Sequence, residues 1–240
     1  SNCVLTSNAT DPDGDSLGYK WEVTGGTLAN ANSQNTTWTM PASAGTYTLK
    51  LTVTDGKGGK DEESRNIEVV SLVYDFMAGA AGARWTSGSG VIPFGGSTSD
   101  NRGFAVFQTN LILEDGAIYS RVLQTHPQWV NNGWISGQFP NATGVIHIPA
   151  GAKFKAKVGF MAGLSATDGV YFRLRFYDGS TWYHFPGMSG IHCTNEGALN
   201  DLNIDLSSIA GKSGSAFLQV DAGASSVQDW AVWVDPVITK

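Results

Sequence analysis

The strongest constraint on this chain is the regular alternation of apolar and polar residues along it. A period of two residues is typical of β-strands with one buried and one exposed face. Clusters of Gly, Asn, Asp and Pro separate the alternating runs, and the 3.6-residue period of helices is almost absent. The sequence therefore predicts an all-β protein of short strands and turns, arranged as β-sandwiches.

The charge and the apolar content of the chain argue against a nucleic-acid partner and against a membrane span. The chain has 15 Lys and Arg residues against 21 Asp and Glu residues, a net charge of -6. Phosphate backbones are bound by clusters of Lys and Arg, which this sequence lacks, so we expect no nucleic-acid partner. No apolar stretch approaches the ~20 residues of a membrane helix, so we expect no membrane span. The length of 240 residues suggests one or two domains.

The first seventy residues have the pattern of an immunoglobulin-like sandwich. In residues 45–55, Tyr47, Leu49, Leu51 and Val53 share one face of a predicted strand, and polar residues share the other. Trp21 is placed like the buried Trp of such sandwiches, and Tyr47 like their tyrosine corner. We therefore expect one buried face and one wet face in this segment.

Residues 4–70 resemble the PKD-type immunoglobulin-like repeats of secreted microbial proteins. The resemblance is carried by the phrases ATDPDGDSLGYKWEV, GTYTLKLTVTDGKGG and RNIEV. Two departures stand out: EVTGG replaces the Phe-Gly-Asp-Gly motif of many members, and little chain precedes Cys3 for a first strand. We interpret the chain as a fragment of a longer protein and expect an exposed edge in the first sheet.

A second domain is predicted from residue 71 onward, because the composition changes there. Six of the eight Trp residues but only two of the six Glu residues lie in 71–240. Without Pro, Gly or a charge run, the join predicts a short, stiff junction. Alternation predicts about eight strands, which suit one jelly-roll sandwich, at 104–109, 117–123, 145–148, 154–160, 170–177, 202–206, 217–221 and 231–238.

Short phrases in this half resemble carbohydrate-binding jelly rolls of the NPCBM type, which are attached to glycoside hydrolases. They are QTHP, FKAKVGF, DGVYFRLRFYDG, NIDLSSIAGKSG and DWAVWVDPVI, in the expected order. The sequence departs at its end, where Trp-Ala-Val-Trp replaces the His-Ala-Asp-Trp of many members. The resemblance implies a glycan-binding module, without the identity of its sugar.

The sequence offers little for catalysis. Its four His residues form no metal-binding pair, and the nucleophile motif Gly-x-Ser-x-Gly is absent. A glycosidase needs two carboxylates, and the only Glu residues of this half are Glu114, in a predicted turn, and Glu196. We expect no enzymatic activity and no organic cofactor, and we expect Cys3 and Cys193 to be free thiols.

The aromatic residues are more informative, because sugars pack their C–H faces against indole and phenol rings beside a few polar groups. Two predicted loops have this character, one around an Asn-Gly turn and one at Trp182–Phe185. The candidate carbohydrate-binding residues are Trp129, Trp134, Trp182, Tyr183, His126, His184 and Arg102. Alternative roles stay open: each Trp could fill the core, His126 could hydrogen-bond a loop, and Arg102 could pair with Asp100.

Calcium is the one candidate metal. Asp11, Asp13 and Asp15 are spaced by one residue around a Gly, as oxygen ligands of one ion can be. Some PKD-type repeats bind calcium near this loop, so the resemblance implies a structural calcium site. A solvated Asx-rich turn is the equal alternative.

Taken together, these patterns predict an immunoglobulin-like PKD spacer at 1–70 and a jelly-roll module at 71–240 that binds polysaccharide or glycan. The expected setting is a secreted or cell-surface multidomain protein, in which the module brings an attached enzyme to its substrate. We expect a monomer whose partners are the glycan and its neighbouring domains. The alternative is a structural or adhesive segment without glycan binding.

Overall fold

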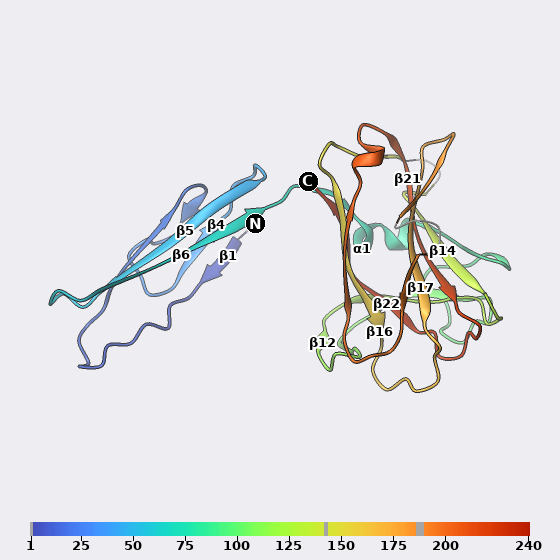
Figure 1. Cartoon of the computed structure of the whole chain (residues 1–240), viewed down its shortest axis with the longest axis horizontal. Coiled ribbons are helices and arrows are strands. Elements are labelled where there is room, and N and C mark those ends of the chain that lie inside the picture. Colours follow the sequence, from blue (N-terminus) through green and yellow to red (C-terminus); the bar gives the residue numbers. More distant parts are fainter. Residues whose placement is uncertain (1, 142–143, 186–189) are drawn as a thin grey trace. The chain divides into compact units, whose positions relative to one another are not determined.

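The computed structural model describes residues 2–141, 144–185 and 190–240. The chain divides into two compact units, Ser1–Ser71 and Leu72–Lys240 (Figure 1). Its helices are single turns: α1 (Phe76–Gly79), η1 (Ala80–Gly82) and η2 (Ser207–Ile209). Nothing helical in the described ranges has the length and apolarity needed to cross a bilayer. The all-β prediction is confirmed.

The first unit consists of two three-stranded antiparallel sheets. One has the order β1-β4-β3, with bounds Asn2–Leu5, Thr36–Thr39 and Thr27–Leu28. The other has the order β2-β5-β6, with bounds Gly18–Val23, Gly45–Thr54 and Lys60–Val69. The long strand predicted at 45–55 is therefore β5.

Two buried indoles form the centre of the first unit. Trp21 was expected in the core, and its indole N–H donates to the Ser33 carbonyl oxygen at 3.0 Å. Trp38 is the second, donating to the carbonyl oxygen of Gly25 at 2.9 Å. The Tyr47 hydroxyl donates to the carbonyl oxygen of Ser43 at 3.0 Å, the bond that defines a tyrosine corner.

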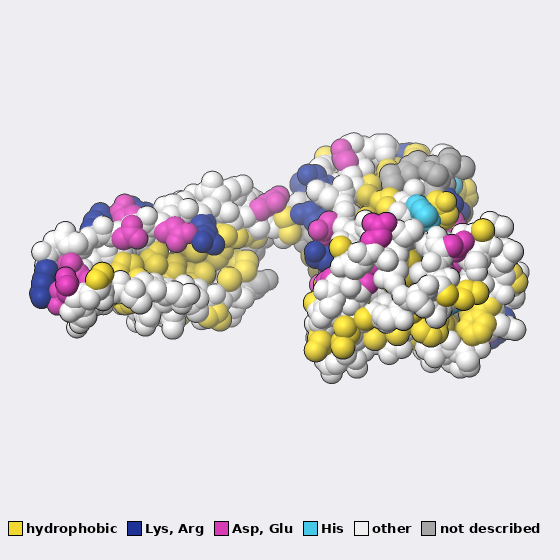
Figure 2. Space-filling model, turned by 60° about the horizontal axis from the view of Figure 1, so that its bottom comes forward, with side chains coloured by type: hydrophobic (Ala, Val, Ile, Leu, Met, Phe, Trp, Pro, Cys, Tyr) yellow, Lys and Arg dark blue, Asp and Glu magenta, His cyan; other side chains and the backbone are white. Residues whose placement is uncertain are grey.

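One side of the first unit is open. Leu49, Leu51 and Val53 of β5 are only half-buried and line a groove of about 530 Å³ together with residues of β1 and β6. Figure 2 shows apolar side chains exposed along this unit. In the described sheet β6 is an edge strand, and its charged residues Asp61 and Glu63 lie opposite Val53 and Leu51. Charges on an edge strand oppose pairing with another chain.

The second unit is a sandwich of a six-stranded and an eight-stranded sheet. The six-stranded sheet has the order β10-β13-β22-β16-β20, with bounds Phe104–Gln108, Val122–His126, Ala231–Thr239, Lys153–Phe160 and Asn200–Asp205. Its sixth strand, β7 (Leu72–Asp75), pairs with β22. A separate hairpin is formed by β11 (Leu111–Ile112) and β12 (Ile118–Tyr119).

The eight-stranded sheet forms the second layer of this sandwich. Its order is β18-β17-β21-β14-β8-β9, with bounds Trp182–Phe185, Val170–Tyr177, Ser213–Ala222, Trp134–Phe139, Arg84–Ser87 and Gly90–Val91. Two short strands complete it: β15 (Ile146–His147) pairs with β21, and β19 (Ile191–Cys193) pairs with β17.

The two sheets enclose one apolar core. Phe172 of β17 meets Trp233 of β22 edge to face, with 4.9 Å between ring centroids, so the sheets pack directly on each other. Trp233 is fully buried, and Trp230 is half-buried against the same core. Cys193 is also buried, and both cysteines are free thiols as predicted. Burial raises the pKa of Cys193 to about 12.

Several local predictions were wrong. The described part of the second unit contains the strands β7 to β22, where about eight were expected, and Trp134, expected in a loop, begins β14. The strand predicted at 117–123 is interrupted, since β12 ends at Tyr119 and β13 begins at Val122. Trp182–Phe185 forms β18, although its run of ring residues had suggested a loop. Aromatic residues favour strands, and β18 extends the sheet along β17.

Candidate functional site

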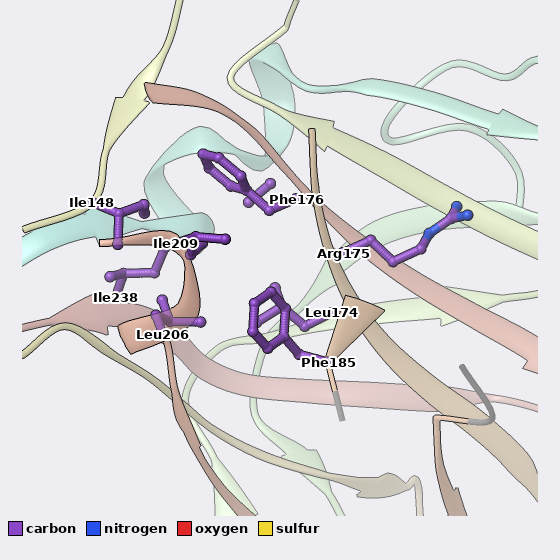
Figure 3. Close-up of a pocket in the computed structure, with 9 residues that line it drawn as sticks. Ile148, Leu174, Arg175, Phe176, Phe185, Leu206, Ile209 and Ile238 are labelled. Atoms are coloured by element: carbon purple, nitrogen blue, oxygen red, sulfur yellow. The ribbon is translucent and has the colours of Figure 1, made fainter. Parts of the chain in front are cut away.

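The outer surface of the eight-stranded sheet gathers aromatic and charged side chains from β17. The alternate residues Val170, Phe172, Leu174 and Phe176 are buried, so the residues between them face outward. Figure 3 shows Leu174 and Phe176 lining a small apolar space inside the sandwich, while Arg175 extends to the other side of the strand. The outward residues of β17 are Tyr171, Arg173, Arg175 and Tyr177.

Strand register brings outward residues of three other strands beside them. Arg173 lies opposite Gln219 of β21, which lies opposite Ser136 of β14. On the other side of β17, Trp182 of β18 lies opposite Tyr177. We call this surface the aromatic face and define it by Trp134, Ser136, Tyr171, Arg173, Arg175, Tyr177, Trp182, His184, Phe217, Gln219 and Asp221.

Three rings of the aromatic face, those of Tyr177, Trp182 and Phe217, pack together and stay partly open to solvent. The Trp182 indole lies 4.9 Å from the Tyr177 ring and 4.7 Å from the Phe217 ring, centroid to centroid, and is 44% exposed. The guanidinium carbon of Arg175 lies 5.2 Å from the Trp182 ring centroid. These contacts fix the position of the indole while leaving part of its surface free for a ligand.

A polar network runs through the same face. Asp221 accepts hydrogen bonds from the Arg173 Nε and from the Gln219 amide nitrogen. The oxygen of the Gln219 amide accepts a hydrogen bond from Arg175. The Ser136 hydroxyl and the Arg175 Nε are buried and have no hydrogen-bond partner among the described residues. Such atoms are rare in folded proteins.

Rings beside fixed donors and acceptors can bind a saccharide. The rings supply apolar surface for C–H groups, and the guanidinium and amide groups can orient hydroxyl oxygens. The chemistry required is recognition, and it needs no group that exchanges protons or forms bonds.

Three predicted residues, Trp134, Trp182 and His184, lie on this face. His184 lies opposite Arg175, and its pKa is lowered by burial and by the nearby charges of Arg175 and Arg173. Tyr183 alternates to the other side of β18, where it is half-buried and packs against the core. Its hydroxyl donates to the carboxylate of Asp178 at 3.2 Å, so Tyr183 is part of the sandwich interior and not of the aromatic face.

Of the other predicted residues, Trp129 and Arg102 lie in loops, and His126 is the last residue of β13. Trp129 is 43% exposed. His126 is only 2% exposed. Its ring stacks on Phe104 at 5.5 Å and makes a tilted contact with Trp129 at 5.4 Å, centroid to centroid. The Nδ1–H of His126 donates to the carbonyl oxygen of Pro127 at 2.7 Å. Burial lowers the pKa of His126 to about 4. This is the loop-bonding alternative, and the His126 ring contacts the Trp129 ring.

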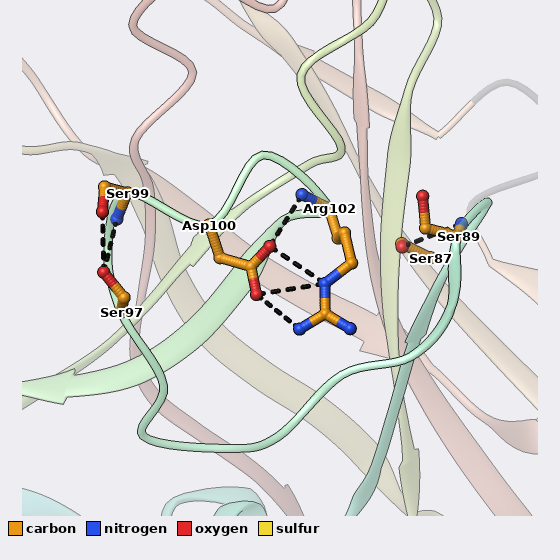
Figure 4. Close-up of polar contacts among 6 residues, drawn as sticks. All are labelled: Ser87, Ser89, Ser97, Ser99, Asp100 and Arg102. Atoms are coloured by element: carbon orange, nitrogen blue, oxygen red, sulfur yellow. Dashed lines mark hydrogen bonds and ion pairs between the residues drawn. The ribbon is translucent and has the colours of Figure 1, made fainter.

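Arg102 is held by an ion pair, which was the alternative to sugar contact. Figure 4 shows its guanidinium bound to both carboxylate oxygens of Asp100, with Nη2–Oδ2 at 2.7 Å and Nε–Oδ1 at 3.1 Å. The hydrogen bonds from Arg102 hold the pKa of the Asp100 carboxyl below its usual value. The pair lies beside the turn of Ser97 and Ser99, whose hydroxyl groups share a hydrogen bond of 2.7 Å (Figure 4).

Two of the residues proposed for calcium, Asp11 and Asp15, contact other protein groups. Asp11 uses one carboxylate oxygen to accept the backbone N–H groups of Asp13, at 2.9 Å, and Asp15, at 3.0 Å. Asp15 forms an ion pair with Lys57 at 2.7 Å. Across the described ranges no three His, Cys, Asp or Glu side chains converge on a common point. The bonds of Asp11 form the Asx turn that the sequence left as the alternative, and calcium binding by this loop stays a prediction.

Glu114, one of the two carboxylates considered for hydrolysis, holds backbone groups of two chain segments together. Glu114 accepts the Phe160 N–H at 2.9 Å with one oxygen, and the Glu196 and Gly197 N–H groups at 2.9 and 3.2 Å with the other. Burial is the main cause that raises the pKa of Glu114. Glu114 thus connects the end of β16 to the loop that contains Glu196.

Sequence reasoning missed most of the aromatic face. It predicted the strand at 170–177 but gave its residues Tyr171, Arg173 and Arg175 no function, and it did not consider Phe217 or Asp221. A signal was present, because a strand buried on one face carries two Tyr and two Arg on the other. Only the pairing of distant strands shows that these residues meet.

Comparison with solved structures found remote relatives. A carbohydrate-binding module from the β-sandwich superfamily has a TM-score of 0.45 and 15% identity, covering 100% of this chain and 92% of that one. CBM27-1 of Caldicellulosiruptor saccharolyticus, solved with mannohexaose, has a TM-score of 0.45, 11% identity and coverages of 71% and 96%. The Stig cyclase Fisc from Fischerella has a TM-score of 0.43, 9% identity and coverages of 71% and 98%. These similarities are too distant to transfer a ligand or an activity.

Comparison of sequences gives a firmer result for the first unit alone. No curated protein matches the chain. A family model of a PKD domain matches residues 1–69, which are nearly all of the unit with the open sandwich. The amino-terminal domain of this chain is therefore a PKD-like domain.

Proposed function

We propose that the second domain is a non-catalytic module that binds a polysaccharide or glycan on its aromatic face. One observation carries the proposal: the exposed indole of Trp182 is packed between Tyr177 and Phe217, beside the network of Arg175 and Gln219. A pyranose could stack on the indole while these polar groups bind its hydroxyls.

The placement of these rings supports binding over a purely structural role. A Trp needed only for stability would be expected in the core, as Trp85 and Trp233 are. Trp182 instead lies on the outside of an edge strand, where its exposed surface contributes little to folding. Several partly exposed rings on one sheet surface indicate a ligand platform.

The polar groups argue for recognition without catalysis. Glycoside hydrolysis needs two carboxylates, one of which is protonated as a general acid. On the aromatic face Asp221 is the one carboxylate among the defining residues, and it accepts hydrogen bonds from Arg173 and Gln219. Glu114 is held by backbone N–H groups elsewhere in the domain.

In this proposal the PKD-like domain is a spacer, and the chain is part of a secreted or cell-surface protein. The module would keep an attached enzyme near its polysaccharide. Even weak binding helps there, because a linked partner acts at a high effective concentration.

The test is glycan-array screening of the chain, followed by titration calorimetry with the best ligand. Trp182→Ala should lower the affinity at least ~10-fold, equal to about 1.4 kcal/mol. Trp129→Ala should have a smaller effect, and Lys155→Ala, on the other sheet, serves as the matched control. Loss of binding in Trp129→Ala alone would move the site to the loops. Failure of the unmodified chain to bind any glycan would contradict the proposal.

A further inference from the structure

The aromatic face carries more positive than negative charge within its polar network. Arg173 and Arg175 project from alternate positions of β17, and Asp221 is the one carboxylate among the residues that define the face. Both Arg side chains are half-buried. Asp221 forms an ion pair with Arg173, whereas Arg175 donates a hydrogen bond to the Gln219 amide oxygen.

Arg175 forms no ion pair of its own among the described residues. Its hydrogen bond goes to the neutral amide oxygen of Gln219, and its Nε has no partner among the described residues. No carboxylate of the described residues lies at ion-pair distance from Arg175. The ion pair on this face joins Arg173 to Asp221. Burial lowers the pKa of Arg175, Asp221 raises it, and the like charge of Arg173 lowers it further.

Some basic side chains of the same domain form an ion pair, and others, like Arg175, form none among the described residues. Arg102, Lys157 and Lys212 each form an ion pair with an aspartate, at 2.7, 3.0 and 3.1 Å. The domain as a whole is slightly acidic, with ten basic and twelve acidic side chains in residues 72–240. A half-buried guanidinium without a carboxylate costs free energy that an anionic ligand could recover.

A guanidinium has a specific preference among anions. Its planar fork forms two parallel hydrogen bonds with a carboxylate or a sulfate, and partial burial strengthens them. A neutral hydroxyl group can accept one such bond but cannot cancel the charge. The Trp182 ring centroid is 5.2 Å from the guanidinium carbon of Arg175, close enough for one sugar unit to contact both.

Resting on the proposed function, we infer that the aromatic face selects an anionic saccharide. Its carboxylate or sulfate group pairs with Arg175, and its ring stacks on Trp182. A uronic acid and a sulfated sugar share this chemistry, and the experiment separates them.

The experiment compares matched polysaccharides that differ only in charge. The whole chain is titrated with polygalacturonate and with its fully methyl-esterified form, and in a second arm with dextran sulfate and dextran. We expect at least one anionic polymer to bind ~10-fold more tightly than its neutral counterpart. The preference should shrink in 0.5 M NaCl, because salt screens charge pairs. The arm that shows it identifies carboxylate or sulfate as the ligand group.

Matched variants assign the preference to one residue. Arg175→Gln should reduce affinity for the anionic polymer at least ~10-fold while leaving affinity for the neutral counterpart within twofold. Lys155→Gln removes the same charge from the other sheet and should change neither. Arg175→Lys keeps the charge but loses the fork, so it should give an intermediate loss even if the Gln variant fails to fold.

The outcomes separate the two proposals. Equal binding of charged and neutral polymers, weakened by Trp182→Ala, would overturn the anionic preference and leave glycan binding intact. If the chain binds neutral array glycans but neither anionic polymer, the anionic preference is likewise overturned and glycan binding is left intact. An anionic preference unchanged in Arg175→Gln would also overturn the inference. Absence of binding to every polymer and array glycan would overturn the proposed function itself.

Discussion

The two outer surfaces of the second domain are built from the same strand pattern and differ in what occupies it. On the six-stranded sheet, β16 points Lys153, Lys155 and Lys157 outward. On the eight-stranded sheet, β17 points two Tyr and two Arg outward. Alternation fixes which positions face outward, and the residue types at those positions decide whether the surface keeps the protein soluble or can bind a ligand.

The surroundings of the two surfaces differ as well. The lysine strand lies beside exposed aspartates of β20, as in the Lys157–Asp201 ion pair, and exposed pairs of this kind contribute little to stability. Another part of the six-stranded sheet is covered, because Leu113 and Tyr119, from the chain around the β11–β12 hairpin, pack with Val122 and Val232. The aromatic face instead leaves rings and half-buried arginines available.

The largest effect is expected where the two surfaces share a core. Trp233→Ala removes the ring that packs against Phe172 across the sheets, so it should lower the free energy of unfolding by about 3–5 kcal/mol. Urea denaturation measures this change. A loss below about 1 kcal/mol would mean that the sheets do not depend on this contact.

A buried carboxyl links the segments that lead into both sheets. Asp229, just before β22, accepts a hydrogen bond from the Thr167 hydroxyl, just before β17, at 2.7 Å. Burial raises the pKa of Asp229 from 3.8 to about 7. The folded state therefore keeps a proton that the unfolded state has released, and this group makes stability fall as the pH rises from about 4 to about 7.

Asp229→Asn should remove that part of the pH dependence. The variant cannot ionise, so above pH 7 it should be more stable than the unmodified chain, by on the order of 2–4 kcal/mol. The two proteins should converge near pH 4. Denaturation at several pH values checks this, and parallel curves for the two proteins would contradict the burial of an ionisable group.

The third effect compares the surfaces by ligand binding. Trp182→Ala should weaken glycan affinity ~10- to 100-fold, or about 1.4–2.8 kcal/mol, because it removes the stacking ring. Lys155→Ala on the other surface should stay within twofold. Equal losses in both variants would show that the two surfaces do not differ in the proposed way.

The smallest effect is expected on the lysine surface. Lys157→Ala breaks the exposed ion pair with Asp201 and should change the free energy of unfolding by less than about 0.5 kcal/mol. Thermal denaturation gives the comparison. A loss above about 1 kcal/mol would show that this surface contributes to folding as well as to solubility.

The sequence was sufficient for the fold class, because strands such as β16 and β17 alternate strictly and predict which residues are buried. It missed β8 and β14, which lie inside the eight-stranded sheet. It was insufficient for the site. The aromatic face joins Trp134, Arg175, Trp182 and Phe217 from four strands, and their register depends on tertiary pairing that no local pattern contains. His126 shows the opposite error: the sequence proposed it as a ligand contact, but stacking on Phe104 of the neighbouring strand buries it.

The most direct test of the central claim is a two-dimensional NMR titration of the ¹⁵N-labelled chain with a glycan that binds it. We expect the largest shifts in the indole N–H signals of Trp134 and Trp182 and in backbone signals of β14, β17, β18 and β21. Shifts confined to the lysine strand β16, or to the loop of Trp129, with the aromatic face unchanged, would contradict the account.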